Sequence, residues 1–301
     1  MLHGFSSYSS LSRIKNNTVT ITMNDILYSS LNAIHKRMAR NILAVRLAIL
    51  IRNQCKRTIS CFLNDGIDPK MNGEEWLAKV AAPTSLVFID VGANVGEWTE
   101  MYLSYMKRAS KGLLFEPSST GFKELKTRFE KLEEIEIVQA AVSDASGEMP
   151  FFEETEAGQT SSLVPGFSRE GAAKKNVRTT TLDLEVEKRQ IDHIDFLKID
   201  AEGYDFHVIR GAKNLLTQHK IDFVQFEYNT PWKDVGSSLT DAYEFFESLN
   251  YKVFLLKKSG LYDINNPKVE DYYFYSNFVA IPAEKLANID IAIKSIKIFS
   301  L

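Results

Sequence analysis

The stretch LVFIDVGANVG, from Leu86 to Gly96, constrains the fold of this 301-residue chain more than any other feature. Leu86 to Ile89 are apolar, with β-branched and aromatic members, and predict a short, fully buried strand. Asp90 stands at the end of this strand, and a glycine-containing loop then leads into an expected helix that begins at Glu97. A strand, a glycine loop and a helix in this order begin a doubly wound α/β sheet, which binds ligands beyond the carboxyl ends of its strands.

Predicted strands and helices alternate after this opening, which favours a mostly parallel sheet. The further strands are expected at 112–116, 135–142, 193–200, 221–227, 251–256 and 272–281. We therefore expect a Rossmann-like α/β domain over 81–282, with a doubly wound, mostly parallel sheet of seven strands. Two alternating segments, 147–152 and 177–182, predict an antiparallel excursion, and the polar segment between them is typical of a lid or binding loop. A closing helix is expected over 283–301.

The N-terminal 80 residues predict a helical extension outside this domain. From Asp25 to Leu63 the chain has no internal Gly or Pro, and its apolar residues follow the three-and-four spacing of one helix face. The opposite face carries seven Lys and Arg residues against Asp25 alone. Such a helix packs on the main domain or on a second subunit in a homo-oligomer, or it makes peripheral contact with an anionic membrane.

Composition excludes some classes of function. A formal net charge of −3 argues against general nucleic-acid binding, so we expect no nucleic-acid partner. The two cysteines, Cys55 and Cys61, match neither a disulfide framework nor the CxxC spacing of metal sites. A reducing, cytoplasmic setting is the simplest inference.

Four expected strands end in acids, namely Asp90, Glu116, Asp200 and Glu227. The carboxyl ends of the strands face the ligand crevice in this architecture, so these acids are expected to lie together there. A single strand-end acid is more often a helix cap or a loop anchor. Four acids in equivalent positions favour a ligand site.

The glycine loop indicates which cofactor the crevice binds. Asn94 stands where a dinucleotide site has its second glycine, and Glu97 in the first helical turn would repel a diphosphate. An NAD-dependent oxidoreductase is therefore disfavoured. Glu116 is placed to accept both hydroxyls of a ribose, and Asp144 or its neighbours to reach an adenine amino group. An amino acid joined to a ribose and an adenine describes S-adenosylmethionine.

The domain also resembles the FkbM family of S-adenosylmethionine-dependent methyltransferases. Its motifs occur in the family's order: DVGANVG at 90–96, FEP at 115–117, AVSD at 141–144, TLD at 181–183, IDFLKIDAEG at 194–203 and VIRGA at 208–212. The KIDAEG segment is the specific part, because class I methyltransferases in general share the opening loop. Ala201 and Asp205 depart mildly from the residues we expect, which are Val and Glu.

This resemblance implies a class I methyltransferase fold and O-methylation of a hydroxyl on a small molecule, such as a sugar or secondary metabolite, or on a glycan. The glycine loop would hold the methionine end of the cofactor, Glu116 the ribose and Asp144 the adenine. The expected cofactor-binding residues are Asp90, Gly92, Ala93, Asn94, Gly96, Thr99, Glu116, Pro117, Ser118, Ala141, Asp144 and Asp200.

Methyl transfer to a hydroxyl requires a group that removes the hydroxyl proton. Asp200 is our first candidate for this general base and Glu202 the second, with Glu227 beside them on the next strand. Alternatively, Asp200 holds the cofactor ammonium and Glu202 caps the following helix. The three carboxylates are also suitable ligands for Mg²⁺, which would lower the pKa of the acceptor hydroxyl. A non-catalytic binding protein built on the same fold is a further alternative.

Overall fold

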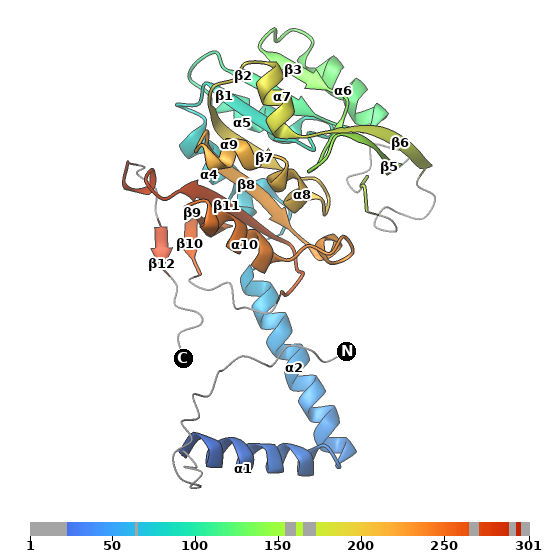
Figure 1. Ribbon diagram of the computed structural model, residues 1–301, viewed down its shortest axis with the longest axis vertical. Helices are drawn as coiled ribbons and strands as arrows, with labels where there is room; N and C mark the ends of the chain where they lie inside the picture. The colour runs from blue at the N-terminus through green and yellow to red at the C-terminus, as the bar shows by residue number, and fades with distance from the viewer. Residues whose placement is uncertain are drawn as a thin grey trace, which may run out of the picture. The chain divides into compact units, whose positions relative to one another are not determined.

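The computed structural model describes residues 23–63, 66–153, 161–164, 173–264, 271–288 and 293–295. The chain divides into two compact units, Met1–Thr58 and Ile59–Leu301. Figure 1 labels the helices and strands of both units. Within the described residues, no helix combines the length and the apolar character that crossing a membrane requires.

The N-terminal segment forms two helices, α1 (Met23–Met38) and α2 (Ile42–Leu63), instead of the single helix expected from Asp25. The break has a local cause in the side chain of Asn41. Its Oδ1 accepts hydrogen bonds from the backbone N–H groups of Leu43, at 2.9 Å, and Ala44, at 3.4 Å. Asparagine is a favoured N-cap, so Asn41 starts a new helix at this point.

The second unit is organised around one sheet of nine strands, in the order β12-β10-β9-β11-β8-β7-β1-β2-β3. The strands are β1 (Val87–Val91), β2 (Lys111–Phe115), β3 (Ile135–Val138), β7 (Ile194–Ile199), β8 (Ile221–Tyr228), β9 (Tyr251–Lys257), β10 (Gly260–Asp263), β11 (Ser276–Pro282) and β12 (Ile293–Ser295). The run from β3 to β8 is parallel, whereas β11 pairs antiparallel with both β8 and β9. The expected number of seven strands is therefore wrong, because β10 and β12 extend the sheet beyond β9.

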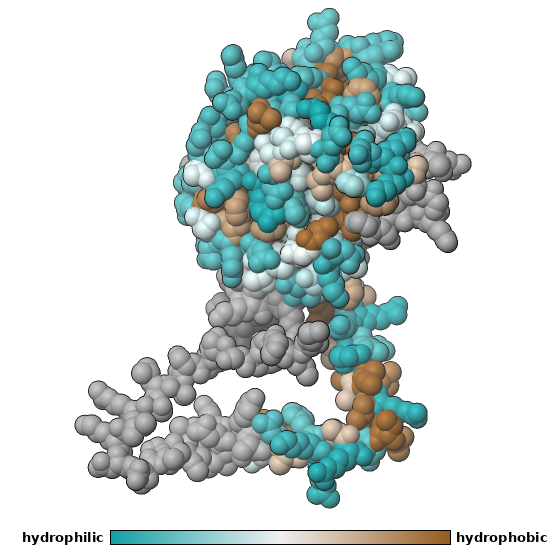
Figure 2. All heavy atoms as spheres, turned by 45° about the vertical axis from the view of Figure 1, so that its right-hand side comes forward, coloured by the Kyte–Doolittle hydropathy of each residue, from teal (hydrophilic) through white to brown (hydrophobic). Residues whose placement is uncertain are grey.

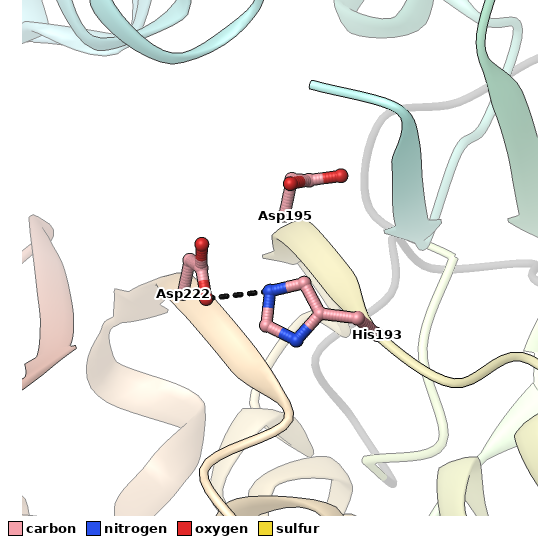
Figure 3. Close-up of side chains that lie close together, drawn as sticks. All are labelled: His193, Asp195 and Asp222. Carbon is pink, nitrogen blue, oxygen red and sulfur yellow. Dashed lines mark ion pairs between the residues drawn. The ribbon is translucent and has the colours of Figure 1, made fainter. Parts of the chain in front are cut away.

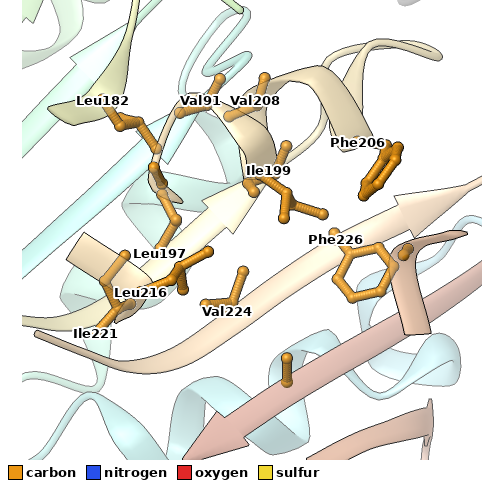
Figure 4. Packing of buried hydrophobic residues seen from close by; sticks show 14 of the residues in the cluster. Val91, Leu182, Leu197, Ile199, Phe206, Val208, Leu216, Ile221, Val224 and Phe226 are labelled. Atoms are coloured by element: carbon orange, nitrogen blue, oxygen red, sulfur yellow. The ribbon is translucent and has the colours of Figure 1, made fainter. Parts of the chain in front are cut away.

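Helices cover both faces of this sheet (Figure 1). One buried cluster joins the sheet to α4 (Glu74–Ala81), α5 (Glu97–Ser104) and α6 (Ser119–Phe129). A second cluster joins the opposite face to α7 (Leu182–Lys188), α8 (Asp205–Arg210), α9 (Lys213–Thr217) and α10 (Leu239–Ser248). Figure 4 shows part of this second cluster around β7 and β8. Successive residues of a strand point to opposite faces, so the near-continuous apolar strands supply both clusters.

The predicted antiparallel excursion is present as a separate small sheet in the order β4-β6-β5. Its strands are β4 (Ala141–Val142), β5 (Gly147–Glu153) and β6 (Ala173–Thr180). The single strand expected over 135–142 is thus divided between two sheets. Much of the expected binding loop, at 154–160 and 165–172, lies outside the described residues.

The closing helix expected over 283–301 is wrong for the residues that the structure describes there. They form a short 3₁₀ helix, η2 (Leu286–Asn288), and the strand β12, which pairs in parallel with β10. Pairing with the sheet edge satisfies the backbone polar groups of this strand without a helix. Two other short elements border the candidate site: α3 (Pro69–Asn72) and the 3₁₀ helix η1 (Thr230–Lys233).

Candidate functional site

A cleft of about 530 Å³ lies at the carboxyl ends of the central parallel strands. It is bordered by the loop after β1, the ends of β2, β7 and β8, and the segments around α3 and η1. The predicted site residues that line it are Gly92, Ala93, Asn94, Glu116, Pro117, Ser118, Ala141, Asp200, Glu202 and Glu227. Asp90, Gly96, Thr99 and Asp144 are not among the lining residues.

A row of polar side chains crosses three strands beneath the cleft. Asp90 of β1 is paired in register with Lys198 of β7, which is paired with Gln225 of β8, so all three point to the face that α4 and α5 cover. Asp90 is fully buried, and its Oδ2 accepts a 2.6 Å hydrogen bond from the Thr99 hydroxyl. Gln225 donates to Glu74 of α4 at 2.9 Å.

Lys198 is the cation of this row. Its Nζ lies 3.0 Å from Asp200 Oδ2 and 3.8 Å from Asp90 Oδ1, and only 5% of its side chain is exposed. Burial alone would lower the pKa of Lys198, but the carboxylates of Asp200, Asp90 and Glu74 raise it above its usual range. Lys198 thus pairs with the buried Asp90 and with Asp200, although it lies inside the strand β7.

Glu74 is a residue of the cleft that the sequence did not reveal. It lines the cleft from α4, and burial raises its pKa to about 7. Nothing in the local pattern of α4 distinguishes Glu74 from an ordinary first-turn acid, which stabilises a helix from solvent. Only the docking of α4 against Gln225 places this carboxyl group beside the cleft.

The loop after β1 is shaped by close backbone contacts. The N–H groups of Gly92 and Ala93 both donate to the Phe115 carbonyl at 3.0 Å. Gly92 has φ of 80°, and a Cβ atom on it would lie 1.8 Å from the Asp200 carbonyl oxygen. Glycine is therefore required at this position. Gly96, with φ of 86°, is the N-cap residue of α5 and packs against Phe129 instead of lining the cleft.

Glu116 ties this loop to the end of β2. Its Oε2 accepts from the Asn94 N–H at 2.8 Å, and its Oε1 accepts from the Ser118 N–H at 2.7 Å. Burial raises the pKa of Glu116 to about 7, although the two backbone hydrogen bonds oppose this rise. Ser118 caps α6 and donates its hydroxyl to Glu153 at 2.7 Å.

Three carboxylates converge after β7 and β8. One oxygen from each of Asp200, Glu202 and Glu227 lies within 4.8 Å of the others. Burial raises the pKa of Glu227 well above its usual value, and the nearby Asp200 and Glu202 raise it further. Asn229 donates to Glu227 Oε1 at 2.5 Å, which partly opposes the rise.

The turn that carries Glu202 has a constrained backbone. Glu202 adopts φ of 48°, a left-handed conformation that is uncommon for residues other than glycine. Buried Asp205 accepts from the N–H groups of Gly203, at 3.2 Å, and Ala201, at 3.4 Å. The Ser162 hydroxyl donates to the Glu202 carbonyl at 2.7 Å. These contacts hold the Glu202 backbone in this conformation beside the cleft.

Asp144 lies apart from the cleft. Its carboxylate is 2.5 Å from Arg210 Nη2 and 3.2 Å from His207 Nδ1. Partial burial would raise the pKa of Asp144, but its contacts with His207 and Arg210 keep it below its usual value. The chain turns from β4 toward α8 at this point, so Ala141 and Val142 line the cleft instead. This placement speaks against the predicted contact between Asp144 and adenine.

The side chains of the cleft fit S-adenosylmethionine better than a phosphate-containing cofactor. Lys198 is the only basic residue in its described lining, and three carboxylates neighbour it. Glu116 offers acceptors for ribose hydroxyls, and Asp200 and Glu202 offer negative charge for a sulfonium or an ammonium. Val142, Phe151 and Leu163 supply apolar surface for a flat base.

A second cluster with metal-ligating residue types lies at the opposite ends of β7 and β8, and contains His193, Asp195 and Asp222 (Figure 3). Its groups already have partners within the protein. His193 Nε2 lies 2.7 Å from Asp222 Oδ1, which also contacts the Lys285 ammonium. Asp195 Oδ2 accepts from the N–H groups of Leu86 and Val87 at 2.8 Å. We interpret this cluster as a structural anchor.

Comparison with known proteins adds the family. The family model described as the Methyltransferase FkbM domain matches residues 90–253, which is more than half of the chain. No curated protein matches the chain. The crystal structure of Methyltransferase FkbM from Methylobacillus flagellatus KT has a TM-score of 0.41 and 15% identity, over 65% of this chain and 43% of that chain. The chain thus spans less than half of the length of that protein.

Other solved structures are similar to a comparable degree. Precorrin-6y C5,15-methyltransferase from Geobacter metallireducens GS-15 has a TM-score of 0.37 and 14% identity, over 68% of this chain and 84% of that chain. A protein from Streptococcus mutans in complex with SAH has a TM-score of 0.38 and 10% identity, over 69% and 93%. The assignment rests on the family model. By its match over residues 90–253, the chain belongs to the FkbM family of S-adenosylmethionine-dependent methyltransferases, which have the class I methyltransferase α/β fold.

Proposed function

We propose that this protein transfers the methyl group of S-adenosylmethionine to a hydroxyl of a sugar, a glycan or a secondary metabolite, with a carboxylate as general base. The observation that carries the proposal is the convergence of Asp200, Glu202 and Glu227 beside the cleft. When bound, S-adenosylmethionine supplies a methyl group activated by its sulfonium. The remaining task of the protein is to orient the acceptor oxygen and to remove its proton.

Asp200 is the first candidate for the base because of its surroundings. The Lys198 ammonium, 3.0 Å away, pairs with the Asp200 carboxylate and fixes its orientation. Glu227 is less suitable, because burial, together with the nearby Asp200 and Glu202, raises its pKa and so favours the protonated form. A protonated carboxyl cannot accept the hydroxyl proton. Glu202 is the second candidate, since it lines the same part of the cleft.

The acceptor side of the cleft is polar and contains one aromatic ring. Asn229, Thr230 and Tyr275 line it near the acid cluster. A sugar ring can stack on Tyr275 while its hydroxyls meet the amide and hydroxyl groups. Tyr228 of β8 and Trp232 of η1 do not take part in this way, because both are fully buried in the core.

A metal-assisted version of the same reaction is a second candidate, and the geometry of the acid cluster favours it. Three carboxylate oxygens within 4.8 Å of one another suit a hard divalent cation such as Mg²⁺. A cation there would offset the mutual repulsion that raises the pKa of Glu227. Activity that survives exhaustive chelation and is not increased by added Mg²⁺ would exclude this version.

Calorimetric titration with S-adenosylmethionine and with NAD tests the cofactor. Binding of NAD without binding of S-adenosylmethionine would overturn the proposal. Incubation with methyl-labelled S-adenosylmethionine and a panel of hydroxylated, amino and thiol acceptors then tests the reaction. Transfer of the label to nitrogen or sulfur, and never to oxygen, would refute the O-directed reaction.

A further inference from the structure

The N-terminal helices carry an exposed apolar surface that the methyltransferase chemistry does not use. On α1 the exposed residues are Leu31, Ile34 and Met38. On α2 they are Ile42, Leu43, Leu47, Ile49, Leu50, Ile51 and Ile59, each between 44% and 68% exposed. Figure 2 shows such hydrophobic side chains in brown along the helical segment, with hydrophilic ones in teal beside them. A surface of this kind marks an interaction site.

The charge of the same segment has only one sign. Residues 26–63 contain Lys36, Arg37, Arg40, Arg46, Arg52, Lys56 and Arg57, and they contain no Asp or Glu. A solvent-facing helix normally mixes both signs, because pairs four residues apart stabilise it. A segment with seven cations and no internal acid is complementary to a surface that carries many negative charges.

On α2, three leucines form an apolar stripe along the helix, and two arginines lie beside it. At about 100° per residue, Leu43, Leu47 and Leu50 lie within an arc of roughly 60°. Arg46 and Arg57 lie beside this stripe on one side. Their side chains can therefore reach a flat surface that the stripe contacts. The long side chain of arginine can place its charge at a headgroup while its methylene groups contact apolar surface.

Pairing with a second copy through this stripe is disfavoured by its length. The three-and-four spacing that begins at Leu43 and continues through Leu50 next reaches Gln54, Arg57 and Cys61. A coiled coil needs apolar residues at these positions over several heptads. A second copy would also bring another seven cations to the interface.

We propose that the helical segment of residues 30–58 docks on an anionic phospholipid surface. The apolar stripe enters the boundary between headgroups and acyl chains, and the flanking arginines contact lipid phosphates. This binding holds the chain at the surface of the bilayer. The proposal does not depend on the reaction or on the acceptor proposed above.

Cosedimentation of the full chain with vesicles tests this proposal. We expect the protein to pellet with vesicles of phosphatidylcholine and phosphatidylserine in equal parts, and to stay in solution with phosphatidylcholine alone. Added salt should weaken the binding, because it screens charge. Equal pelleting with both kinds of vesicle, or none with the anionic vesicles, would overturn the proposal.

Matched variants separate the two contributions. L47E/L50E should abolish pelleting, and R46E/R57E should lower the partition coefficient by about fivefold or more for each charge lost. R46K/R57K keeps the charge and should bind as the natural chain does. Helix content by circular dichroism and calorimetric binding of SAH should be equal in all of these chains, which excludes misfolding. Vesicle binding that survives L47E/L50E refutes the proposal. The proposal is also refuted if the natural chain binds no vesicles and instead forms a dimer that L47E/L50E dissociates.

Discussion

The carboxyl group of Glu116 allows a sharp test of how the cleft binds its cofactor. Burial raises the pKa of Glu116 to about 7, so the free protein holds a mixture of charged and neutral forms at neutral pH. Both oxygens of Glu116 already accept a hydrogen bond, one from the Asn94 N–H and one from the Ser118 N–H. The ribose hydroxyls would donate further hydrogen bonds to the same two oxygens. Only the carboxylate can accept so many hydrogen bonds, because a protonated carboxyl needs an acceptor for its own proton.

The size of the expected change in cofactor affinity with pH follows from this pKa. With a pKa of about 7, roughly 91% of Glu116 is charged at pH 8 and roughly 9% at pH 6, so the apparent affinity should fall about tenfold between them. Affinity is therefore present above pH 7 and is lost below it. Glu116→Gln should remove this slope. It should also weaken binding at pH 8 by about 2 kcal/mol, or roughly thirtyfold, because two charge-assisted hydrogen bonds become neutral ones.

Calorimetric titration with SAH across this pH range measures both effects without turnover. Glu74 and Asp205, each with a pKa raised to about 7 by burial, also titrate in or beside the cleft. The contribution of Glu116 is therefore the difference in slope between the natural chain and Glu116→Gln. Glu153→Gln is a matched control, because Glu153 is buried and binds Ser118 but does not line the cleft. The same slope in natural chain and Glu116→Gln would refute the ribose contact.

Three other variants test separate parts of the site. Asp200→Asn should lower turnover about a hundredfold or more, with the SAH dissociation constant changed less than about threefold, and a fully active variant would reject Asp200 as base. The raised folded-state pKa of Glu74 means that the natural chain gains stability as pH falls through about 7 toward 4.5. Urea unfolding of Glu74→Gln should show this gain reduced by about 3 kcal/mol, and an unchanged pH profile would contradict it. Gly92→Ala should destabilise the fold by at least about 2 kcal/mol more than Gly66→Ala. Gly66 has a similar φ of 86° but nothing near its Cβ position, so equal losses would show that the contact with the Asp200 carbonyl is unimportant.

The elements that the local sequence pattern predicts well are the strands that are buried on both faces of the sheet. The strands β1, β2, β7 and β8 are mostly apolar on both faces, and the sequence shows this directly as short runs with few polar residues. The extra edge strand β12 was missed, although the alternation of Ile289, Ile291 and Ile293 is a strand pattern. The pairing of β12 with β10 depends on where the preceding hairpin ends, which is a property of the assembled sheet.

The residues of the candidate site also divide into those that the local sequence pattern predicts and those that depend on tertiary packing. The glycine loop, Glu116, Asp200 and Glu227 follow from strand ends, because all parallel strands end at one edge of the sheet. Asp144 does not line the cleft but pairs with Arg210 and His207, and no sequence pattern indicated these contacts. Glu74 was missed, since its helix precedes the domain in sequence and reaches the cleft only through packing. Residues carried into the site by tertiary docking leave no periodic signal of their own.

The KIDAEG segment shows how one short stretch combines both kinds of information. Period-two alternation puts Lys198 and Asp200 on the same face of β7, and this local rule accounts for their 3.0 Å contact. The charge of Lys198 is required for a non-local reason, because Asp90 and Glu74 reach it from two other elements. Removing the ammonium would leave three neighbouring buried or half-buried acids without a cation. Such groups take up protons instead of remaining charged. Lys198 therefore holds the carboxylate of Asp200, the proposed base, in a direct ion pair that it shares with the buried Asp90.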